Sequence, residues 1–136
     1  MKEEKHQETI KEVLDEIESA LKDKRGLVSH QRRLAFVISL GASNILELYF
    51  HKNNVIKEGS IVNHLWFKRK KEKIINQLQN QLTSPIDSLN EINKILGIII
   101  KIEEKRDDIA YGAPASEKIL QEKINLFFEL RKLTKC

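Results

Sequence analysis

Apolar residues recur every three or four positions along most of the chain, the spacing that places them on one face of an α-helix. Over residues 3–24 the pattern is one-sided, with charged residues at most of the remaining positions. Residues 29–52 are apolar on almost every side, which predicts the most buried helix of the protein. Gly26 separates the two segments, Ser29 is expected to cap the second, and Gly41 in its middle indicates close packing against a neighbouring helix.

The same spacing predicts three further helices, which cover residues 60–82, residues 85–111 and the segment after Ser116. Ser84 and Pro85 suit the cap and the first position of the fourth helix. Gly112 is expected to end that helix in the left-handed conformation, and Ser116 is expected to cap the fifth. Each predicted helix is therefore bounded by residues with a chemical reason to interrupt it.

The chain has 136 residues, which is enough for one domain and too few for two. Its 40% hydrophobic residues can form a core, while 5 Gly and 2 Pro leave little material for the turns of a β-fold. Short connections make consecutive helices antiparallel. We therefore predict one all-α domain over residues 1–136, an up-and-down bundle of about five helices.

The chain carries no sign of export, of a membrane span or of a cofactor. Cys136 is its one cysteine, so neither an internal disulfide nor a thiolate metal site is expected. The longest apolar run, residues 96–100, is far shorter than the roughly 20 residues of a spanning helix. No nucleotide-cradling glycine loop occurs, and the histidine spacings do not fit a metal site. We expect a cytoplasmic protein without membrane association, metal or cofactor.

A run of basic residues is the first candidate for a binding site. The net charge of +4 is modest, but five cations gather within six positions, at Lys68, Arg69, Lys70, Lys71 and Lys73. Together with Trp66 and Phe67, such a helix could hold a phosphate backbone and stack on bases, as in single-strand binders. The alternative is a solvated helix face whose two aromatic residues lie in the core.

Arg106 is the second candidate, because it falls within the apolar arc of the predicted fourth helix. A guanidinium there needs a buried anion or a partner outside its own subunit. Alternatively, its head reaches water near the helix end and interacts with the terminal carbonyls. Glu47, the one acidic residue of the most buried helix, is a conceivable partner for Arg106.

The string from Arg106 to Gly112, RDDIAYG, resembles the signature of the HEPN superfamily. Arg106 matches the family's arginine, Asp107 its following polar residue, and Tyr111 stands at the position of its histidine. These proteins are helical bundles, commonly dimers, and often metal-independent ribonucleases. The resemblance implies a homodimer with two motifs in one cleft, and Arg106, Asp107 and Tyr111 as its catalytic residues.

Tyrosine at the histidine position changes the expected chemistry, because its ordinary pKa of about 10 makes it a poor base at neutral pH. His51 or His64 could replace the missing group through space. We expect a HEPN-like dimer that binds RNA or a nucleotide, with ribonuclease activity weakened or lost, and whether it is an enzyme stays open. The alternative is a non-enzymatic interaction module, such as a toxin–antitoxin-type protein partner or a structural bundle.

Overall fold

Six α-helices and three short 3₁₀ helices make up the computed structural model, which describes residues 2–136 and has no β-strand in this range. The α-helices are α1 (Glu3–Lys22), α2 (Gln31–Lys52), α3 (Lys71–Gln79), α4 (Ile92–Glu103), α5 (Arg106–Tyr111) and α6 (Glu117–Thr134). The 3₁₀ helices are η1 (Leu27–His30), η2 (His64–Lys68) and η3 (Ile86–Ser88). Since α4 and α5 share the predicted fourth segment, the all-α bundle of about five helices is confirmed.

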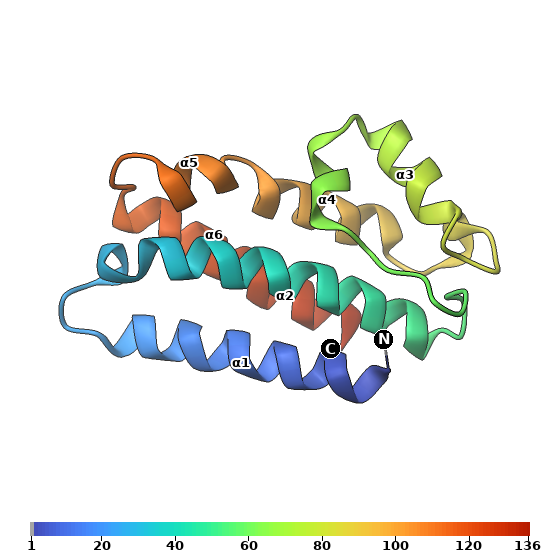
Figure 1. Ribbon diagram of the computed structural model, residues 1–136, viewed down its shortest axis with the longest axis horizontal. Coiled ribbons are helices and arrows are strands. Elements are labelled where there is room, and N and C mark those ends of the chain that lie inside the picture. The colour runs from blue at the N-terminus through green and yellow to red at the C-terminus, as the bar shows by residue number, and fades with distance from the viewer. Residues whose placement is uncertain (1) are drawn as a thin grey trace.

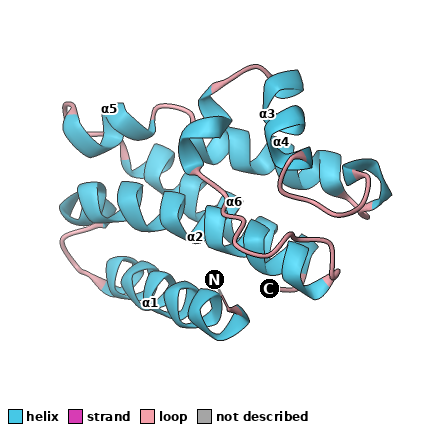
Figure 2. Cartoon of the chain, turned by 45° about the vertical axis from the view of Figure 1, so that its right-hand side comes forward, coloured by secondary structure: helices cyan, strands magenta, loops and turns pink. Residues whose placement is uncertain are grey.

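Helix α2 lies at the centre of the bundle (Figure 1), with α1 on one side and the α4–α5 pair on the other. Helix α6 packs against both α2 and α4, and α5 also contacts α2. Successive long helices run in alternating directions, as expected of an up-and-down bundle. Figure 2 shows that α3 and the loops around it cover one end of α4.

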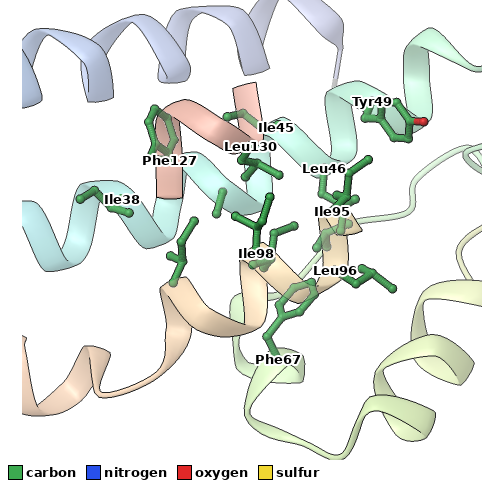
Figure 3. Close-up of a cluster of buried hydrophobic side chains, with 14 of the residues drawn as sticks. Ile38, Ile45, Leu46, Tyr49, Phe67, Ile95, Leu96, Ile98, Phe127 and Leu130 are labelled. Carbon is green, nitrogen blue, oxygen red and sulfur yellow. The ribbon is translucent and has the colours of Figure 1, made fainter. Parts of the chain in front are cut away.

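The core is formed by apolar side chains from every α-helix, and Figure 3 shows its central part around α2, α4 and α6. Gly41 lies where both α1 and α6 come close to α2. A Cβ atom at this position would lie 2.5 Å from Cε1 of Phe127 and 3.0 Å from Cγ1 of Val13. The close helix packing predicted for Gly41 is therefore confirmed.

Residues Leu27–Lys52 form one helical stretch that is long and apolar enough, by length and composition, to cross a membrane. Its mean hydropathy reaches 1.3 over 18 residues, although the sequence contains no long uninterrupted apolar run. In the bundle 67% of that window is buried, and a central core helix has the same composition. That the protein does not associate with a membrane stays a prediction.

The connection between α1 and α2 is set by a contact from α6. Gly26 adopts a φ of 90°, and the carboxylate of Glu117 accepts the backbone N–H groups of Leu27 and Val28 at 3.0 Å each. Ser29 was expected to cap the second helix, but its hydroxyl donates to the carbonyl of Gly26 at 2.8 Å. The predicted cap is wrong because Glu117 already satisfies amides at the start of η1, whereas α2 begins at Gln31.

The cap predicted for the fifth helix is confirmed. The Ser116 hydroxyl accepts the backbone N–H of Ile119 at 3.2 Å, at the start of α6. This contact lies within four residues, so it depends on local sequence alone.

The third helix begins at Lys71, so its predicted start near Ser60 is wrong. The segment after α2 is held in an extended form by two distant partners. The N–H of Val62 donates to Oε1 of Glu47 at 2.5 Å, and the N–H of Lys57 donates to the carbonyl of Gln81 at 2.9 Å. Backbone groups that bond across the fold in this way are not free to form a helix.

The fourth helix begins at Ile92, seven residues after the predicted start at Pro85. Ser84 caps no helix, because the Gln79 side chain binds both sides of this turn. Its amide donates to the carbonyl of Ser84 at 2.9 Å, and its oxygen accepts the N–H of Ile86 at 2.8 Å. Only one 3₁₀ turn, η3, forms before α4.

The predicted helix over residues 85–111 is also interrupted near its end, between α4 and α5. Lys105 has a φ of 58°, and Nζ of Lys123 donates to the carbonyls of Lys101 at 2.5 Å and Glu104 at 2.7 Å. These contacts satisfy carbonyls that the helix end leaves free. The predicted arc around Arg106 is therefore wrong, because Arg106 begins α5 instead of continuing α4.

Gly112 ends α5 in an extended conformation, with φ −93° and ψ −162°, so the predicted left-handed stop is wrong. The reason for glycine is a lack of space. A Cβ atom here would collide with the backbone carbonyl of Asp108, which accepts the N–H of Gly112 at 2.8 Å.

Candidate nucleic-acid interface

Two hollows meet where the basic run faces the junction of α4 and α5. The first, which we call the junction groove, has a volume of about 380 Å³ and is lined by Phe67, Lys68, Arg69, Ile100, Glu103, Glu104, Lys105, Arg106, Asp107 and Asp108. The second, which we call the basic hollow, measures about 530 Å³ and is lined by Lys68, Arg69, Lys70 and Lys73. Lys68 and Arg69 line both, so the two sequence candidates share one continuous surface.

Asp107 joins these two candidates directly. Its Oδ2 accepts a hydrogen bond from Nζ of Lys68 at 2.5 Å, across 39 residues of sequence, and its Oδ1 accepts one from Nη1 of Arg106 at 2.9 Å. The bond from Lys68, and then that from Arg106, hold the pKa of Asp107 below its usual range. The carboxylate therefore stays ionised and holds two cations side by side.

Arg106 neither reaches the carbonyls of its helix end nor pairs with Glu47. Its side chain is 13% exposed, and its Cζ lies 5.1 Å from the centre of the Phe36 ring. A guanidinium over an aromatic face is attracted by the electrons of the ring. Its Nε atom is buried without a hydrogen-bond partner, which leaves one donor of this cation unused.

Tyr111 is the last residue of α5, and its ring lies 5.7 Å from that of Phe36 in an edge-to-face arrangement. It is 70% exposed, whereas Phe36 is 38% exposed. Phe36 belongs to the helix that the sequence predicts to be apolar on almost every side. Its place four residues after Arg32 and four before Leu40, both exposed as well, was the signal of an outward stripe.

The basic run turns a corner instead of continuing one helix. Lys68 ends η2, Arg69 and Lys70 are extended, and Lys71 begins α3 without lining either hollow. Phe67 is buried in the core, as the alternative interpretation of this run held, and Trp66 packs partly against the core. The prediction that bases stack on Phe67 is therefore wrong. The cations between η2 and α3 are exposed.

The two histidines proposed as replacements have different surroundings. Nδ1 of His64 lies 3.6 Å from Oε2 of Glu103, and Glu103 is part of the junction groove. His51 instead lies with its ring 5.4 Å from that of His6, beside a separate hollow that Glu3 and Lys57 also line. Of the two, only His64 lies near a residue of the junction groove, and His64 itself lines neither hollow.

Glu47 has a structural partner in place of the suggested Arg106. Its Oε2 lies 2.9 Å from Nε2 of His6, whose Nδ1 lies 2.7 Å from Oδ1 of Asn44. Burial lowers the pKa of His6, but the bonds to Glu47 and Asn44 outweigh it, so that the pKa is raised. This buried group joins α1, α2 and the extended segment at Val62.

Two further observations bear on the site. Within residues 2–136, no three His, Cys, Asp or Glu side chains are grouped so that they could hold a metal ion. No protein-family model, curated protein or solved structure matches the chain.

Proposed function

We propose that this protein binds RNA, with the phosphate backbone along the basic hollow and into the junction groove. The observation that carries the proposal is the Lys68–Asp107–Arg106 contact, which places the Arg106 guanidinium beside one of the four exposed cations of the basic hollow. Lysine and arginine bind phosphates by charge, and arginine can donate two bonds to one phosphate. The spacing of these cations suits a chain of phosphates better than one isolated anion.

The charges favour the basic hollow as the main contact. All four of its lining residues are cationic, and of these only Lys68 forms an ion pair within residues 2–136. The junction groove contains four carboxylates beside its four cations. A phosphate is therefore attracted most strongly to the basic hollow. Arg106, in the junction groove, would contact the RNA backbone where it leaves that hollow.

Tyr111 supplies a surface for bases. Its ring is largely exposed and is held at the edge of Phe36, so a base can stack on it without first ordering a flexible side chain. No set of side chains at this surface has the paired donors and acceptors that read one base. We infer binding to unpaired RNA of any sequence, or to single nucleotides with lower affinity.

The resemblance to HEPN proteins supports a second part of the proposal, a homodimer. Phe36 and Leu40 are exposed on adjacent turns of α2, at 38% and 49%, and Phe36 lies beside the motif residues Arg106 and Tyr111. Exposed apolar groups in a row favour protein contact. A second copy seated here would bring two junction grooves together, as the resemblance implies.

RNA binding is tested by fluorescence anisotropy with a labelled, unstructured oligoribonucleotide at 50 and 200 mM salt. Arg106→Ala is expected to weaken binding about tenfold and to reduce the salt dependence by about one phosphate contact. Arg25→Ala is the matched control, since Arg25 also pairs with a neighbouring aspartate but lies at the other connection, between α1 and α2. Equal affinities of the two variants, or no binding by the wild type, would contradict the proposal.

The dimer is tested separately by sedimentation equilibrium. Leu40→Lys is expected to convert a dimeric wild type into a monomer, because it places a charge in the contact. A protein that docks a different partner would instead be monomeric in both forms and would bind RNA poorly whichever residue is changed. That outcome would favour the interaction module over the RNA-binding protein.

A further inference from the structure

Lys123 of α6 is a partly buried cation whose ammonium group bonds to the main chain at the end of α4. Its Nζ donates to the carbonyl oxygens of Lys101 at 2.5 Å, Ile102 at 3.3 Å and Glu104 at 2.7 Å. An ammonium group has three donors, so these three carbonyls use all of them. The charge of Lys123 is therefore fixed at the point where α4 ends.

These bonds compete with the hydrogen bonds that would join α4 to α5. In a continuous α-helix each carbonyl accepts the N–H of the fourth residue along the chain. The three carbonyls bound by Lys123 would then accept the N–H groups of residues 105, 106 and 108. The ammonium of Lys123 thus replaces three helical bonds across the junction.

The local sequence favours a continuous helix at this junction. Lys105 has a φ of 58°, the left-handed conformation that is costly for a residue with a side chain. Ile99, Ile102 and Ile109 keep the apolar spacing of one helix across the break. Without the ammonium of Lys123, we therefore expect α4 and α5 to join.

Joining the two helices would move Arg106. In an unbroken helix Arg106 would lie four residues after Ile102 and on the same face. Ile102 is 2% exposed, so this face is in the core. In the structure the Arg106 guanidinium instead lines the junction groove, bonds to Asp107 and lies over the Phe36 ring. The place of Arg106 in the groove therefore depends on the break between α4 and α5.

We propose that Lys123 is the positioning residue of the RNA-binding site. Its ammonium keeps α4 and α5 apart, and Arg106 reaches the junction groove only in this arrangement. This inference rests on the proposed RNA binding. Lys123 lines neither the junction groove nor the basic hollow, so it acts without contacting RNA. Loss of its charge would remove the contribution of Arg106 and keep that of the basic hollow.

The first test measures the affinity of the full chain for the labelled oligoribonucleotide by fluorescence anisotropy. Lys123→Met keeps the apolar stem but removes the ammonium, and it is expected to weaken binding about tenfold, as Arg106→Ala does. Adding Arg106→Ala to Lys123→Met is expected to cost less than about twofold more, because Arg106 has already left the groove. Lys118→Met is the matched control, since it removes an exposed lysine of the same helix and should keep the full effect of Arg106→Ala.

A second pair of variants changes the break at Lys105. Lys105→Gly and Lys105→Ala remove the same charge, but glycine adopts the left-handed conformation freely, whereas alanine favours a helix. We expect Lys105→Gly, and not Lys105→Ala, to restore the full effect of Arg106→Ala in the Lys123→Met background. The pair also tests the proposal if Lys123→Met fails to fold. In the wild-type background, Arg106→Ala should then cost more affinity in Lys105→Gly than in Lys105→Ala.

Hydrogen exchange tests the joining of the helices without RNA. The N–H of Arg106 lies in the first turn of α5, where an amide has no partner within its helix. In Lys123→Met this N–H is expected to bond to the carbonyl of Ile102, so its exchange should slow at least about tenfold. The N–H of Ile109, which bonds to the carbonyl of Lys105 at 3.0 Å, is the control. Faster exchange at Ile109 would identify a variant that has lost structure.

The outcomes distinguish this inference from the proposed function. An undiminished effect of Arg106→Ala in Lys123→Met would overturn the role of Lys123 and leave RNA binding in place. Exchange of the Arg106 amide that stays as fast as in the wild type would do the same, as would equal effects of Arg106→Ala in Lys105→Gly and Lys105→Ala. Absence of RNA binding by the wild type would overturn both proposals.

Discussion

The two sides of α2 differ in how completely their groups are partnered. On the side of α1 and α6, Gly41 is in contact range of both neighbours, and the polar groups of the connection bond to one another. On the side of α5 and η2, Phe36 and Leu40 are exposed and Arg106 keeps an unused donor. Both sides are rich in cations, so charge alone does not distinguish a structural region from a binding surface.

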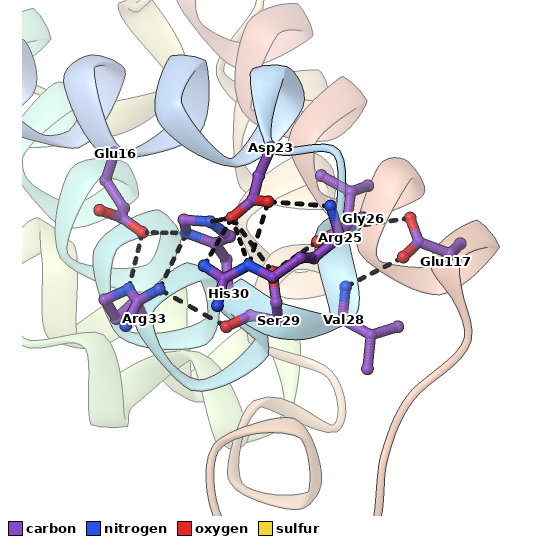
Figure 4. A network of polar contacts seen from close by, with 10 residues as sticks. Glu16, Asp23, Arg25, Gly26, Val28, Ser29, His30, Arg33 and Glu117 are labelled. Carbon is purple, nitrogen blue, oxygen red and sulfur yellow. Dashed lines mark hydrogen bonds and ion pairs between the residues drawn. The ribbon is translucent and has the colours of Figure 1, made fainter.

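The partnered side is best seen at His30, a buried residue at the end of η1 (Figure 4). Its Nδ1 lies 2.9 Å from Oε1 of Glu16, and its Nε2 lies 2.8 Å from Oδ2 of Asp23. Arg33 also bonds to Glu16, and Arg25 bonds to Asp23. Each cation here has a carboxylate within the same cluster, which leaves little to attract an external anion.

The His30 cluster is expected to contribute most to stability. Carboxylates at both ring nitrogens favour the protonated form of His30, in which bonds between charged groups contribute about 1.5 kcal/mol each. We predict that His30→Gln lowers the free energy of unfolding by about 3 kcal/mol, measured by urea denaturation. His64→Gln serves as the control and is expected to cost less than about 1 kcal/mol, because its single ion pair is longer and more exposed. Equal losses would show that the two sides of α2 do not differ.

The same cluster predicts a pH dependence. The bonds to Glu16 and Asp23 raise the pKa of His30 above its usual 6.5. This contribution is complete below pH 6.5 and is lost as the pH rises through the raised pKa of the folded state. Bonds from Arg25 and His30 lower the pKa of Asp23, so the contribution of this carboxylate to the free energy of unfolding is lost only in strong acid. The stability difference between wild type and His30→Gln should therefore narrow from pH 6 to pH 9, and a constant difference would contradict the protonated state.

Substitution of Gly41 tests the packing on the side of α2 that faces α1 and α6. Alanine in place of a mid-helix glycine normally gains about 1 kcal/mol, but here its Cβ atom would overlap the Phe127 ring. Overpacking of this kind costs about 1–3 kcal/mol. We predict that Gly41→Ala destabilises the protein by about 1–2 kcal/mol in urea. Gly97→Ala in α4 is the control and should stabilise the protein, since no atom lies within 4 Å of the added Cβ; stabilisation by both would contradict the close contact.

The helical character and much of the core could be predicted because periodicity reports which face of a helix is apolar. The cap at Ser116 could be predicted because it depends on local sequence. The close packing at Gly41 could be predicted because this residue has no side chain. The starts of α3 and α4 could not be predicted in this way. They depend on Glu47 bonding to Val62 and on Gln79 bonding across the turn at Ser84, contacts that only the folded chain brings together.

The sequence identified several residues of the candidate site, but it did not predict that they lie together. Sequence singled out the basic run and Arg106 separately, yet the contact of Lys68 with Asp107 spans 39 residues. The apolar arc around Arg106 assumed one unbroken helix, whereas Lys123 bonds to the carbonyls that end α4. The buried Glu103 side chain likewise accepts a bond from Ser39 and lies near His64, and these two residues come from two other elements.

The smallest expected effect concerns Asp107, which occupies the Nζ of Lys68 and one amino group of Arg106. A phosphate must displace this carboxylate before it can use both cations. We predict that Asp107→Asn tightens RNA binding about threefold at 50 mM salt and increases the dependence of affinity on salt. Anisotropy measurements at several salt concentrations test this.

Asp108→Asn is the matched control for this change. It alters the net charge equally at the next residue of the same groove, but Asp108 forms no ion pair within residues 2–136 that its neutralisation would release. If Asp108→Asn tightens binding as much as Asp107→Asn, the gain reflects net charge alone. Weaker binding by Asp107→Asn would instead mean that the carboxylate holds Lys68 and Arg106 in their binding positions. The side of α2 that faces α5 and η2 would then be organised before its ligand binds.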